Sequence, residues 1–424
     1  MTRKPQPADP RSRLRLLLSA YACEPGHGSE PGIGWHVACQ QAEAYDVWVL
    51  TRANNRPRIE RELARRPRPG LRFIYFDLPL PFRLAKRLPL GVQFYYPLWQ
   101  RMSLRVLRRR AAEVDFDVAQ HITFGRYWTP SPLPALGLPF VWGPLGGGDA
   151  VPAAFRSSLG ASGRLLNVVR DMARRLGELS PLVGRDAREA CAILATTPAT
   201  ARRIQRLGSG PVSCVPAVGL SDDDLARLGA MPRPPEHPVR FISIGRLAHW
   251  KGFHYGLRAY AKADLPETEF WIVGDGPERG RLKRLVNDLG IANRVRFFGF
   301  LSREETLARL GECHVLVHPS LHDSGGWVCL EAMAARRPVI YLDLGGPPVL
   351  VSSEAGIAVD AATPDAAVGA LADGMSRLAS SPELRAEQGL AGRRHVEDSH
   401  SWTARGRTLR AVVAGCAGRP EADE

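Results

Sequence analysis

The sequence predicts an α/β protein built from two doubly wound domains, each with its own parallel sheet. Its 424 residues are too many for one ordinary domain and suit two domains of about 200 residues, each able to bury a core. Short apolar runs alternate with longer helical segments in both halves of the chain. Several of these runs end in a glycine-rich turn that opens a helix, which is the usual junction in a parallel sheet.

In the N-terminal half, three apolar runs are expected to be strands: residues 47–50, 71–76 and 118–121. An earlier apolar run, residues 16–23, has the length of a secretory signal core, but Arg15 crowds it and a glycine loop with a helical pattern follows at once. We therefore interpret this segment as a first strand, a glycine loop and a helix. No apolar run approaches the ~18 residues of a membrane span.

In the C-terminal half, the most informative stretch is a turn rich in glycine and acid. Residues 313–317 are expected to form a buried strand and residues 328–335 a helix. Asp323 lies in the turn between them and Glu331 in the helix, with seven residues separating the two acids. Glycines let backbone N–H groups approach a ligand closely, and a helix start adds unpaired donors, so the turn suits a diphosphate.

A second cluster supplies positive charge. Residues 240–244 are expected to form a strand that ends in Gly245, and Arg246 and Lys251 follow in a basic loop before a helix. Ligand contacts in a doubly wound sheet come from these carboxyl ends of strands. Either turn alone fits a tight connection without a ligand. Together, two cations facing a glycine-rich turn predict a diphosphate site.

With these clusters, the sequence resembles the retaining glycosyltransferases of family four. That family has the GT-B architecture of two facing Rossmann-like domains with a C-terminal crossover helix. The resemblance is carried by Asp323 and Glu331 with residues 332–334, by residues 245–246 and 251–252, and by residues 274–277 and 295–300. It covers almost the whole chain, although the family more often has Glu at the position of Asp323.

The resemblance implies that the chain is divided into three parts. Residues 1–212 are expected to form an acceptor-side Rossmann-like domain, residues 213–398 a nucleotide-sugar-binding domain, and residues 399–424 a crossover helix and tail. Residues 212–215 are expected to open the second domain.

The resemblance also implies an activity: transfer of a sugar, with retention and without metal or other cofactor, from a GDP- or UDP-linked donor to a lipid-linked or polysaccharide acceptor in cell-envelope or exopolysaccharide synthesis. Arg246 and Lys251 are expected to stabilise the departing diphosphate. The implied catalytic residues are His121, Arg246, Lys251 and Asp323. The implied donor-binding residues are Gly28, Ser29, Gly245, Arg246, Lys251, Phe298, Gly299, Gly325, Gly326, Trp327 and Glu331.

One acidic pattern favours a different explanation. Asp222 and Asp224 have the Asp-x-Asp spacing that metal-dependent glycosyltransferases of another fold use to hold a cation. Ser221 before them is a natural helix N-cap, and acids in a first turn are favoured by the helix dipole. We therefore predict a cap here and no bound metal.

The net charge of +14 predicts attraction to phosphates, anionic lipid or nucleic acid. Nucleic acid is not expected as a partner, because no recognised motif or set of aromatic platforms accompanies the charge. Two basic helical segments, residues 98–110 and 164–179, leave two alternatives open: solvated faces packed on their own domain, or contact with an anionic membrane. In the second segment one face gathers Leu165, Val169, Met172, Leu176 and Leu179.

The seven cysteines are scattered and odd in number, so they are expected to be reduced thiols in a cytoplasmic protein, with peripheral attachment to the inner face of the membrane left open. Two other functions remain in play: a transferase acting on a soluble acceptor such as a sugar phosphate or natural product, and a catalytically silent protein that binds nucleotides or nucleic acid.

Overall fold

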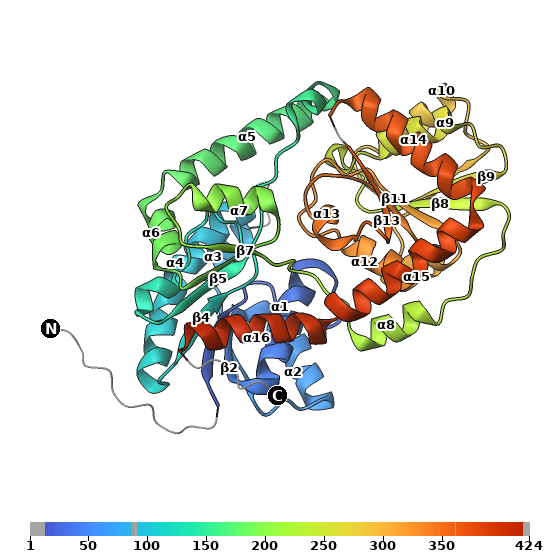
Figure 1. The fold of residues 1–424 in the computed structure, drawn as a ribbon. Coiled ribbons are helices and arrows are strands. Elements are labelled where there is room, and N and C mark those ends of the chain that lie inside the picture. Colours follow the sequence, from blue (N-terminus) through green and yellow to red (C-terminus); the bar gives the residue numbers. More distant parts are fainter. Residues whose placement is uncertain (1–12, 87, 89–90, 361, 419–424) are drawn as a thin grey trace.

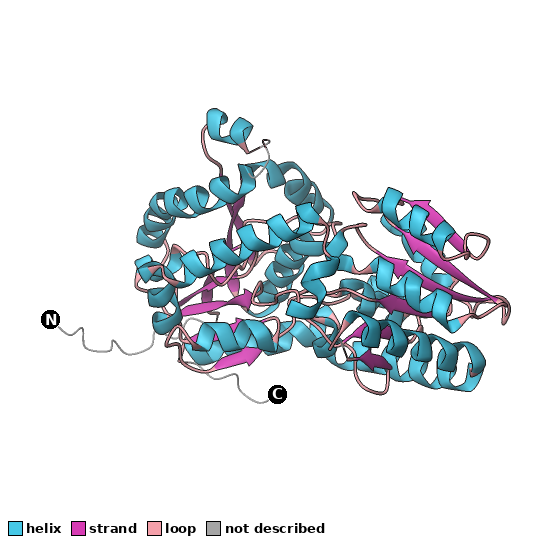
Figure 2. Ribbon diagram, turned by 90° about the horizontal axis from the view of Figure 1, so that it is seen from above, coloured by secondary structure: helices cyan, strands magenta, loops and turns pink. Residues whose placement is uncertain are grey.

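The computed structural model describes residues 13–86, 88, 91–360 and 362–418. Two parallel sheets form two domains, and helices cover both faces of each sheet (Figures 1 and 2). The predicted fold class, two Rossmann-like domains in the GT-B arrangement, is confirmed by this architecture and by the structural comparisons given below. None of the helices in the described ranges has the length and apolar character needed to cross a bilayer.

The first sheet has seven parallel strands in the order β3-β2-β1-β4-β5-β6-β7. Its strands are β1 (Arg15–Ser19), β2 (Asp46–Arg52), β3 (Leu71–Phe76), β4 (Val118–His121), β5 (Phe140–Leu145), β6 (Ala192–Ala195) and β7 (Val212–Cys214). Its helices are α1 (Ser29–Ala44), α2 (Arg56–Arg65), α3 (Leu80–Ala85), α4 (Gly91–Glu113), α5 (Ala161–Glu178), α6 (Pro181–Glu189) and α7 (Pro198–Gln205). The strands expected at residues 47–50, 71–76 and 118–121 are confirmed as β2, β3 and β4.

The second sheet has six parallel strands in the order β10-β9-β8-β11-β12-β13. Its strands are β8 (Val239–Ile244), β9 (Thr268–Val273), β10 (Val295–Gly299), β11 (Val315–His318), β12 (Val339–Leu342) and β13 (Gly356–Val359). The accompanying helices are α8 (Asp222–Gly229), α9 (Phe253–Ala263), α10 (Arg279–Asp288), α11 (Arg303–Gly311), α12 (Trp327–Ala334), α13 (Pro347–Leu350), α14 (Pro364–Ser380) and α15 (Pro382–Ser399).

Two segments do not follow the expected domain boundary. Residues 212–215 were expected to open the second domain, but β7 pairs with β6 as the last strand of the first sheet. Residues 151–159, which follow β5, pack on the core of the second domain, where the buried rings of Phe155 and Tyr255 meet edge to face at 5.4 Å between centroids. The apolar pattern of a strand does not say which sheet it will join, because that is decided by contacts distant in sequence.

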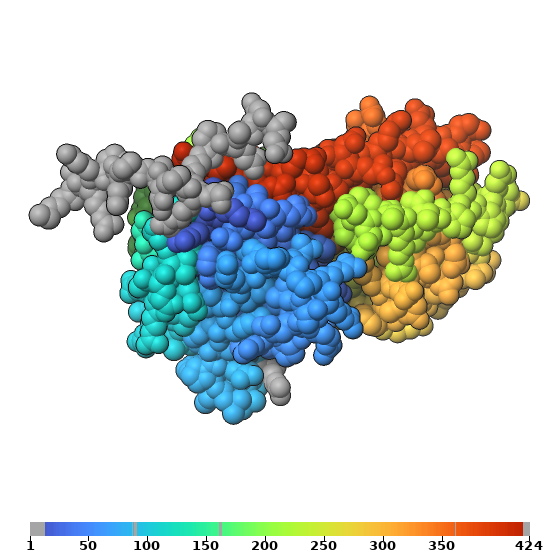
Figure 3. Space-filling model, turned by 90° about the horizontal axis from the view of Figure 1, so that it is seen from below, coloured from blue at the N-terminus to red at the C-terminus, as the bar shows by residue number. Residues whose placement is uncertain are grey.

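The last helix, α16 (Trp402–Cys416), crosses back onto the first domain. Figure 3 shows this C-terminal segment lying against the N-terminal part of the chain. Arg410 Nη1 donates to the backbone oxygen of Gln40 at 2.9 Å, and Tyr45 donates its hydroxyl proton to the backbone oxygen of Arg410 at 2.9 Å. The crossover helix expected from the resemblance is therefore present.

The expectation that all seven cysteines are reduced thiols is wrong for two of them. Cys191, just before β6, and Cys416, the last residue of α16, form a disulfide with 5.8 Å between their Cα atoms. They are 225 residues apart in sequence, so their spacing gave no hint of pairing. The other five cysteines are free thiols, and four of them are buried.

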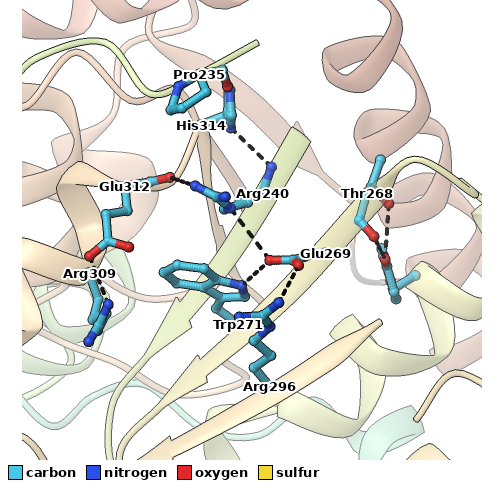
Figure 4. Close-up of polar contacts among 10 residues, drawn as sticks. Pro235, Arg240, Thr268, Glu269, Trp271, Arg296, Arg309, Glu312 and His314 are labelled. Atoms are coloured by element: carbon cyan, nitrogen blue, oxygen red, sulfur yellow. Dashed lines mark hydrogen bonds and ion pairs between the residues drawn. The ribbon is translucent and has the colours of Figure 1, made fainter. Parts of the chain in front are cut away.

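A polar network closes the amino ends of β8, β9 and β10, at the edge of the second sheet opposite its glycine turns (Figure 4). Glu269 accepts hydrogen bonds from Trp271 Nε1 at 2.8 Å and from Arg296 Nη2 at 2.7 Å, and Arg240 Nε lies 3.4 Å from its carboxylate. The Arg240 backbone N–H donates to His314 Nδ1 at 3.0 Å. These contacts pair the charges at this edge with one another within the domain, whereas the glycine turns lie at the carboxyl edge, where doubly wound sheets bind ligands.

Candidate active site

The turn between β11 and α12 is closed by the carboxylate of Asp323. Its Oδ1 accepts hydrogen bonds from the backbone N–H groups of Gly325 at 3.1 Å and Gly326 at 3.2 Å. Gly326 has φ +56°, a left-handed conformation that glycine adopts without strain, and it directly precedes α12. Because both N–H groups are paired within the turn, the donor-binding role expected for Gly325 and Gly326 stays a prediction.

The start of α12 remains uncapped, since no described side chain accepts a hydrogen bond from its first turn. The first N–H groups of a helix have no partner inside the helix and carry the positive end of its dipole. Trp327 is the first residue of α12, so this end of the helix can receive an anion.

Lys251 and Asp323 form an ion pair between the loops that follow β8 and β11. Lys251 Nζ lies 2.5 Å from Asp323 Oδ2, and His318 Nε2 lies 3.1 Å from the same oxygen. Burial alone would raise the pKa of Asp323, but Lys251 and His318 outweigh burial and hold this pKa well below its ordinary value. Asp323 is therefore ionised at neutral pH.

The loop that carries Lys251 is fitted closely to the Asp323 side of the site. Gly252 has φ +65°, and a Cβ added there would lie 1.9 Å from the backbone oxygen of Pro319. Only glycine permits this approach, which keeps Lys251 within reach of Asp323.

Arg246 is the free cation of the site. It follows Gly245 at the carboxyl end of β8 and is exposed, and its side chain makes no hydrogen bond or ion pair with the rest of the described chain. The loop itself is fixed, because the Leu247 N–H donates to the backbone oxygen of Asp275 at 2.9 Å. The structure thus brings Lys251 to Asp323 and leaves Arg246 available to a ligand.

Glu331 lies in α12 and is held by Arg303, a residue that the sequence analysis missed. Arg303 donates from Nη2 to Glu331 at 2.9 Å and from Nη1 to Asp224 at 2.8 Å. Burial raises the pKa of Glu331, while Arg303 opposes that rise. A signal was present in the sequence: Arg303 follows the N-cap Ser302 of α11, at the positive end of a helix, where a cation is unfavourable without an acidic partner.

The acidic run at Asp222–Asp224 is part of a cap, as predicted. Ser221 accepts a hydrogen bond from the Asp224 N–H at 3.1 Å at the start of α8. Asp224 also pairs with Arg303, so its carboxylate supports Arg303 in holding Glu331.

The first glycine loop meets the start of α12 across the domain boundary. Gly28 is the N-cap of α1 and Ser29 its first residue, with a left-handed φ of +61°. One turn later, a Cβ added to Gly32 would lie 3.4 Å from the Trp327 ring. Trp327 also packs edge to face on Trp402. The structure therefore brings Trp327 beside the helix that Gly28 and Ser29 open.

His121 ends β4 in a buried polar network of the first domain. Its Nε2 lies 3.2 Å from the Tyr96 hydroxyl and its Nδ1 lies 3.1 Å from the Ser131 hydroxyl. Burial lowers the pKa of His121 to about 4, so the ring is neutral at physiological pH. Its described hydrogen-bond partners all belong to the first domain, and its expected role beside the donor sugar stays a prediction.

Phe298 and Gly299 lie at the carboxyl end of β10. The Phe298 ring packs on Trp271 at 4.9 Å between centroids, and the Gly299 backbone oxygen accepts a hydrogen bond from the Gly274 N–H at 2.8 Å. In the described ranges no hydrogen bond joins them to Lys251, Asp323 or Glu331. Their expected contact with a nucleotide base is untested.

The second domain matches a known protein family. Residues 230–395 match the family described as "Glycosyl transferases group 1". The lipopolysaccharide core biosynthesis glycosyltransferase LpsE of Rhizobium meliloti is 38% identical over 128 residues, which cover 30% of this chain and 36% of LpsE. The alpha-D-kanosaminyltransferase of Streptomyces kanamyceticus is 37% identical over 150 residues, which cover 34% of this chain and 37% of that enzyme. The chain thus spans little more than a third of either relative.

Two solved structures match nearly the whole chain. The sucrose-phosphate synthase of Thermosynechococcus elongatus has a TM-score of 0.62 at 19% identity, covering 94% of this chain and 98% of that one. HepE of Anabaena, solved in complex with UDP, has a TM-score of 0.61 at 16% identity, covering 95% and 100%. Residues 230–395 thus match the group 1 glycosyltransferases, and the chain as a whole has the GT-B fold of these solved structures.

Proposed function

We propose that the protein is a retaining glycosyltransferase that uses a nucleoside diphosphate sugar, GDP- or UDP-linked, and needs no metal. The observation that carries the proposal is the pairing of Lys251 with the ionised Asp323 beside the uncapped start of α12, within the residues that match the family. Free Arg246 on the neighbouring loop completes a site for an anionic donor.

The reaction requires above all that the negative charge on the departing diphosphate be stabilised. Arg246, Lys251 and the N-terminus of α12 supply three sources of positive potential, which stabilise that charge in the transition state without a cation. Lys251 is paired with Asp323 before the donor arrives, so donor binding moves part of its hydrogen bonding to phosphate. The released carboxylate of Asp323 then meets hydroxyl groups of the donor sugar.

Glu331 accepts hydrogen bonds from the ribose hydroxyls, because an ionised carboxylate is an acceptor for both. Arg303 keeps Glu331 oriented for that contact. The acceptor hydroxyl attacks the face that the leaving group vacates, and the departing phosphate takes its proton, which gives retention.

The acceptor is lipid-linked or a saccharide of the cell envelope, and the enzyme works at the cytoplasmic face of the membrane. The similarity to a lipopolysaccharide core glycosyltransferase supports this choice. A soluble acceptor is the second candidate, favoured by the similarity to the kanosaminyltransferase.

The test is a nucleotide-release assay across GDP- and UDP-sugars, without metal, with and without a lipid extract. Lys251→Ala is the test variant, and Lys283→Ala is its control, because Lys283 is an exposed lysine on α10 of the same domain. We expect release from one donor that Lys251→Ala lowers at least about a hundredfold and Lys283→Ala leaves unchanged.

The dependence on the lipid extract separates the two acceptor classes. Release that needs the extract supports the membrane acceptor, and release with soluble sugars alone supports the second candidate. Donor binding without release from any donor or acceptor would identify a silent nucleotide-binding protein and overturn the proposal.

A further inference from the structure

Helix α5 is amphipathic in the reverse of the usual sense, with its apolar side chains facing solvent. Leu165, Leu166, Val168, Val169, Met172, Leu176 and Leu179 are 45% to 79% exposed. Leu182 at the start of the next helix, α6, is also 50% exposed. A contiguous apolar ridge of this kind on a folded chain marks a surface that another phase or molecule covers.

The inner face of α5 carries the polar residues. Arg174 is buried and donates to Asp171 at 2.9 Å, and Glu178 accepts from Arg203 at 2.9 Å. Both acids of α5 are therefore neutralised on the side that faces the protein. The exposed charges of the helix are those of Arg164 and Arg175.

This helix borders the candidate active site. Arg170 Nη2 and Arg174 Nη1 each lie 3.5 Å from a backbone oxygen of the glycine loop after β5, at Gly147 and Asp149. Near the other end, a Cβ added to Gly163 would lie 2.7 Å from the ring of His249, two residues before Lys251. Figure 1 shows α5 running along the outside of the first domain with its N-terminal end beside the second domain.

We infer that the outer face of α5 docks on an anionic lipid bilayer. The bilayer interior covers the apolar ridge, and Arg164 and Arg175 meet lipid phosphates, since no acid points outward from this helix. A second protein with a matching apolar face would bury the ridge equally well, but it gives no reason for outward charge of one sign.

Membrane docking by α5 would bring the enzyme to a lipid-linked acceptor, and only this role of the docking depends on the proposed function. An α-helix with its side chains is ~10–12 Å across, so a bilayer on the outer face of α5 lies about one helix diameter from the loop at Gly147. The sugar of a lipid-linked acceptor can span that distance while its lipid stays in the membrane. The basic helix α4 packs Tyr96, Trp99 and Leu107 on its own domain and exposes a single large apolar side chain, Phe94, near its start, so it carries no apolar row like that of α5.

The experiment is co-sedimentation of the full chain with vesicles of phosphatidylcholine, alone or mixed with phosphatidylglycerol. One variant carries Leu165→Gln, Met172→Gln and Leu176→Gln on the ridge, and a second carries Arg164→Gln and Arg175→Gln. The control carries Arg101→Gln, Arg105→Gln and Arg108→Gln on α4, where all three side chains are exposed. Sedimentation velocity of the same proteins without lipid reports self-association.

We expect the wild type and the α4 control to bind mixed vesicles alike, and the ridge variant to bind at least about tenfold more weakly. The arginine variant should lose affinity for mixed vesicles and keep whatever affinity it has for phosphatidylcholine alone. Equal binding by the ridge variant and the wild type overturns the inference. A wild-type dimer that the ridge variant dissociates, with no vesicle binding by either, also overturns it.

The vesicle assay contains neither donor nor acceptor, so its failure leaves the nucleotide-release result untouched. All altered residues are exposed, and an unchanged melting temperature of each variant shows that the fold is intact.

Discussion

Replacing Lys251 with methionine removes the cation from a largely buried ion pair and leaves Asp323 without its main partner. The side chains of Lys251 and Asp323 are only 21% and 17% exposed. Breaking a buried pair on one side costs roughly 3–5 kcal/mol of unfolding free energy. Asp323 keeps two backbone hydrogen bonds and the nearby His318, so we expect a loss of about 2–3 kcal/mol for Lys251→Met.

The pH dependence of this loss has a definite sign. In the wild type the pKa of Asp323 lies well below 3.8, so the pair contributes its full stability above that pH and loses it as pH falls through the folded-state pKa. Without Lys251, the folded-state pKa of Asp323 is higher than in the wild type, because one of the groups that lower it is gone. The folded variant then takes up a proton at a higher pH than the folded wild type, so its deficit is largest at pH 7 and shrinks as pH falls.

Urea unfolding followed by tryptophan fluorescence measures the deficit, with Lys283→Met as the matched control. The double variant Lys251→Met/Asp323→Asn completes a cycle, and the two single losses should exceed the combined loss by roughly 1–2 kcal/mol. Losses that simply add, or a Lys251→Met protein as stable as the control, would refute the ion pair as the organising contact of the site.

Three further substitutions test other parts of the structure. His121 has a folded pKa of about 4 against 6.5 ordinarily, so its contribution is present above pH 6.5 and is lost as pH falls toward 4; the melting temperature of His121→Asn should vary less over that window than that of the wild type. Arg303→Gln frees Glu331 from its partner and should weaken nucleotide binding by about tenfold in calorimetry, whereas unchanged affinity would leave Glu331 without the orienting role argued for Arg303. Ser221→Ala removes the cap of α8 and should lower unfolding free energy by about 1 kcal/mol in urea denaturation; no change would deny the cap any weight.

The strands and the glycine turns were predictable because they depend on local patterns. Runs of β-branched and apolar residues gave β2, β3 and β4 within a few residues, and the turn before α12 was identified from its glycines. The partner of each strand was not predictable in the same way, as β7 shows, because sheet order depends on contacts distant in sequence.

The sequence predicted which residues belong to the candidate site, but it did not predict the contacts that those residues make. Asp323 was recognised as important, but its shorter side chain folds back onto Gly325 and Gly326, a choice that depends on the exact backbone of the turn. The periodicity of α5 defined an apolar face without showing whether that face turns inward or outward. Cys191 and Cys416 meet only because α16 crosses back to the first domain.

The central claim is that Arg246, Lys251 and the start of α12 bind a nucleoside diphosphate. The most direct test is calorimetric titration of UDP and GDP into the wild type and into Arg246→Ala, because Arg246 has no described side-chain partner and its removal leaves the fold unchanged. Arg258→Ala, an exposed arginine on α9, is the control. We predict binding of one nucleotide that Arg246→Ala weakens at least about tenfold and Arg258→Ala does not. Failure of the wild type to bind either nucleotide, or equal binding by Arg246→Ala, would contradict the account.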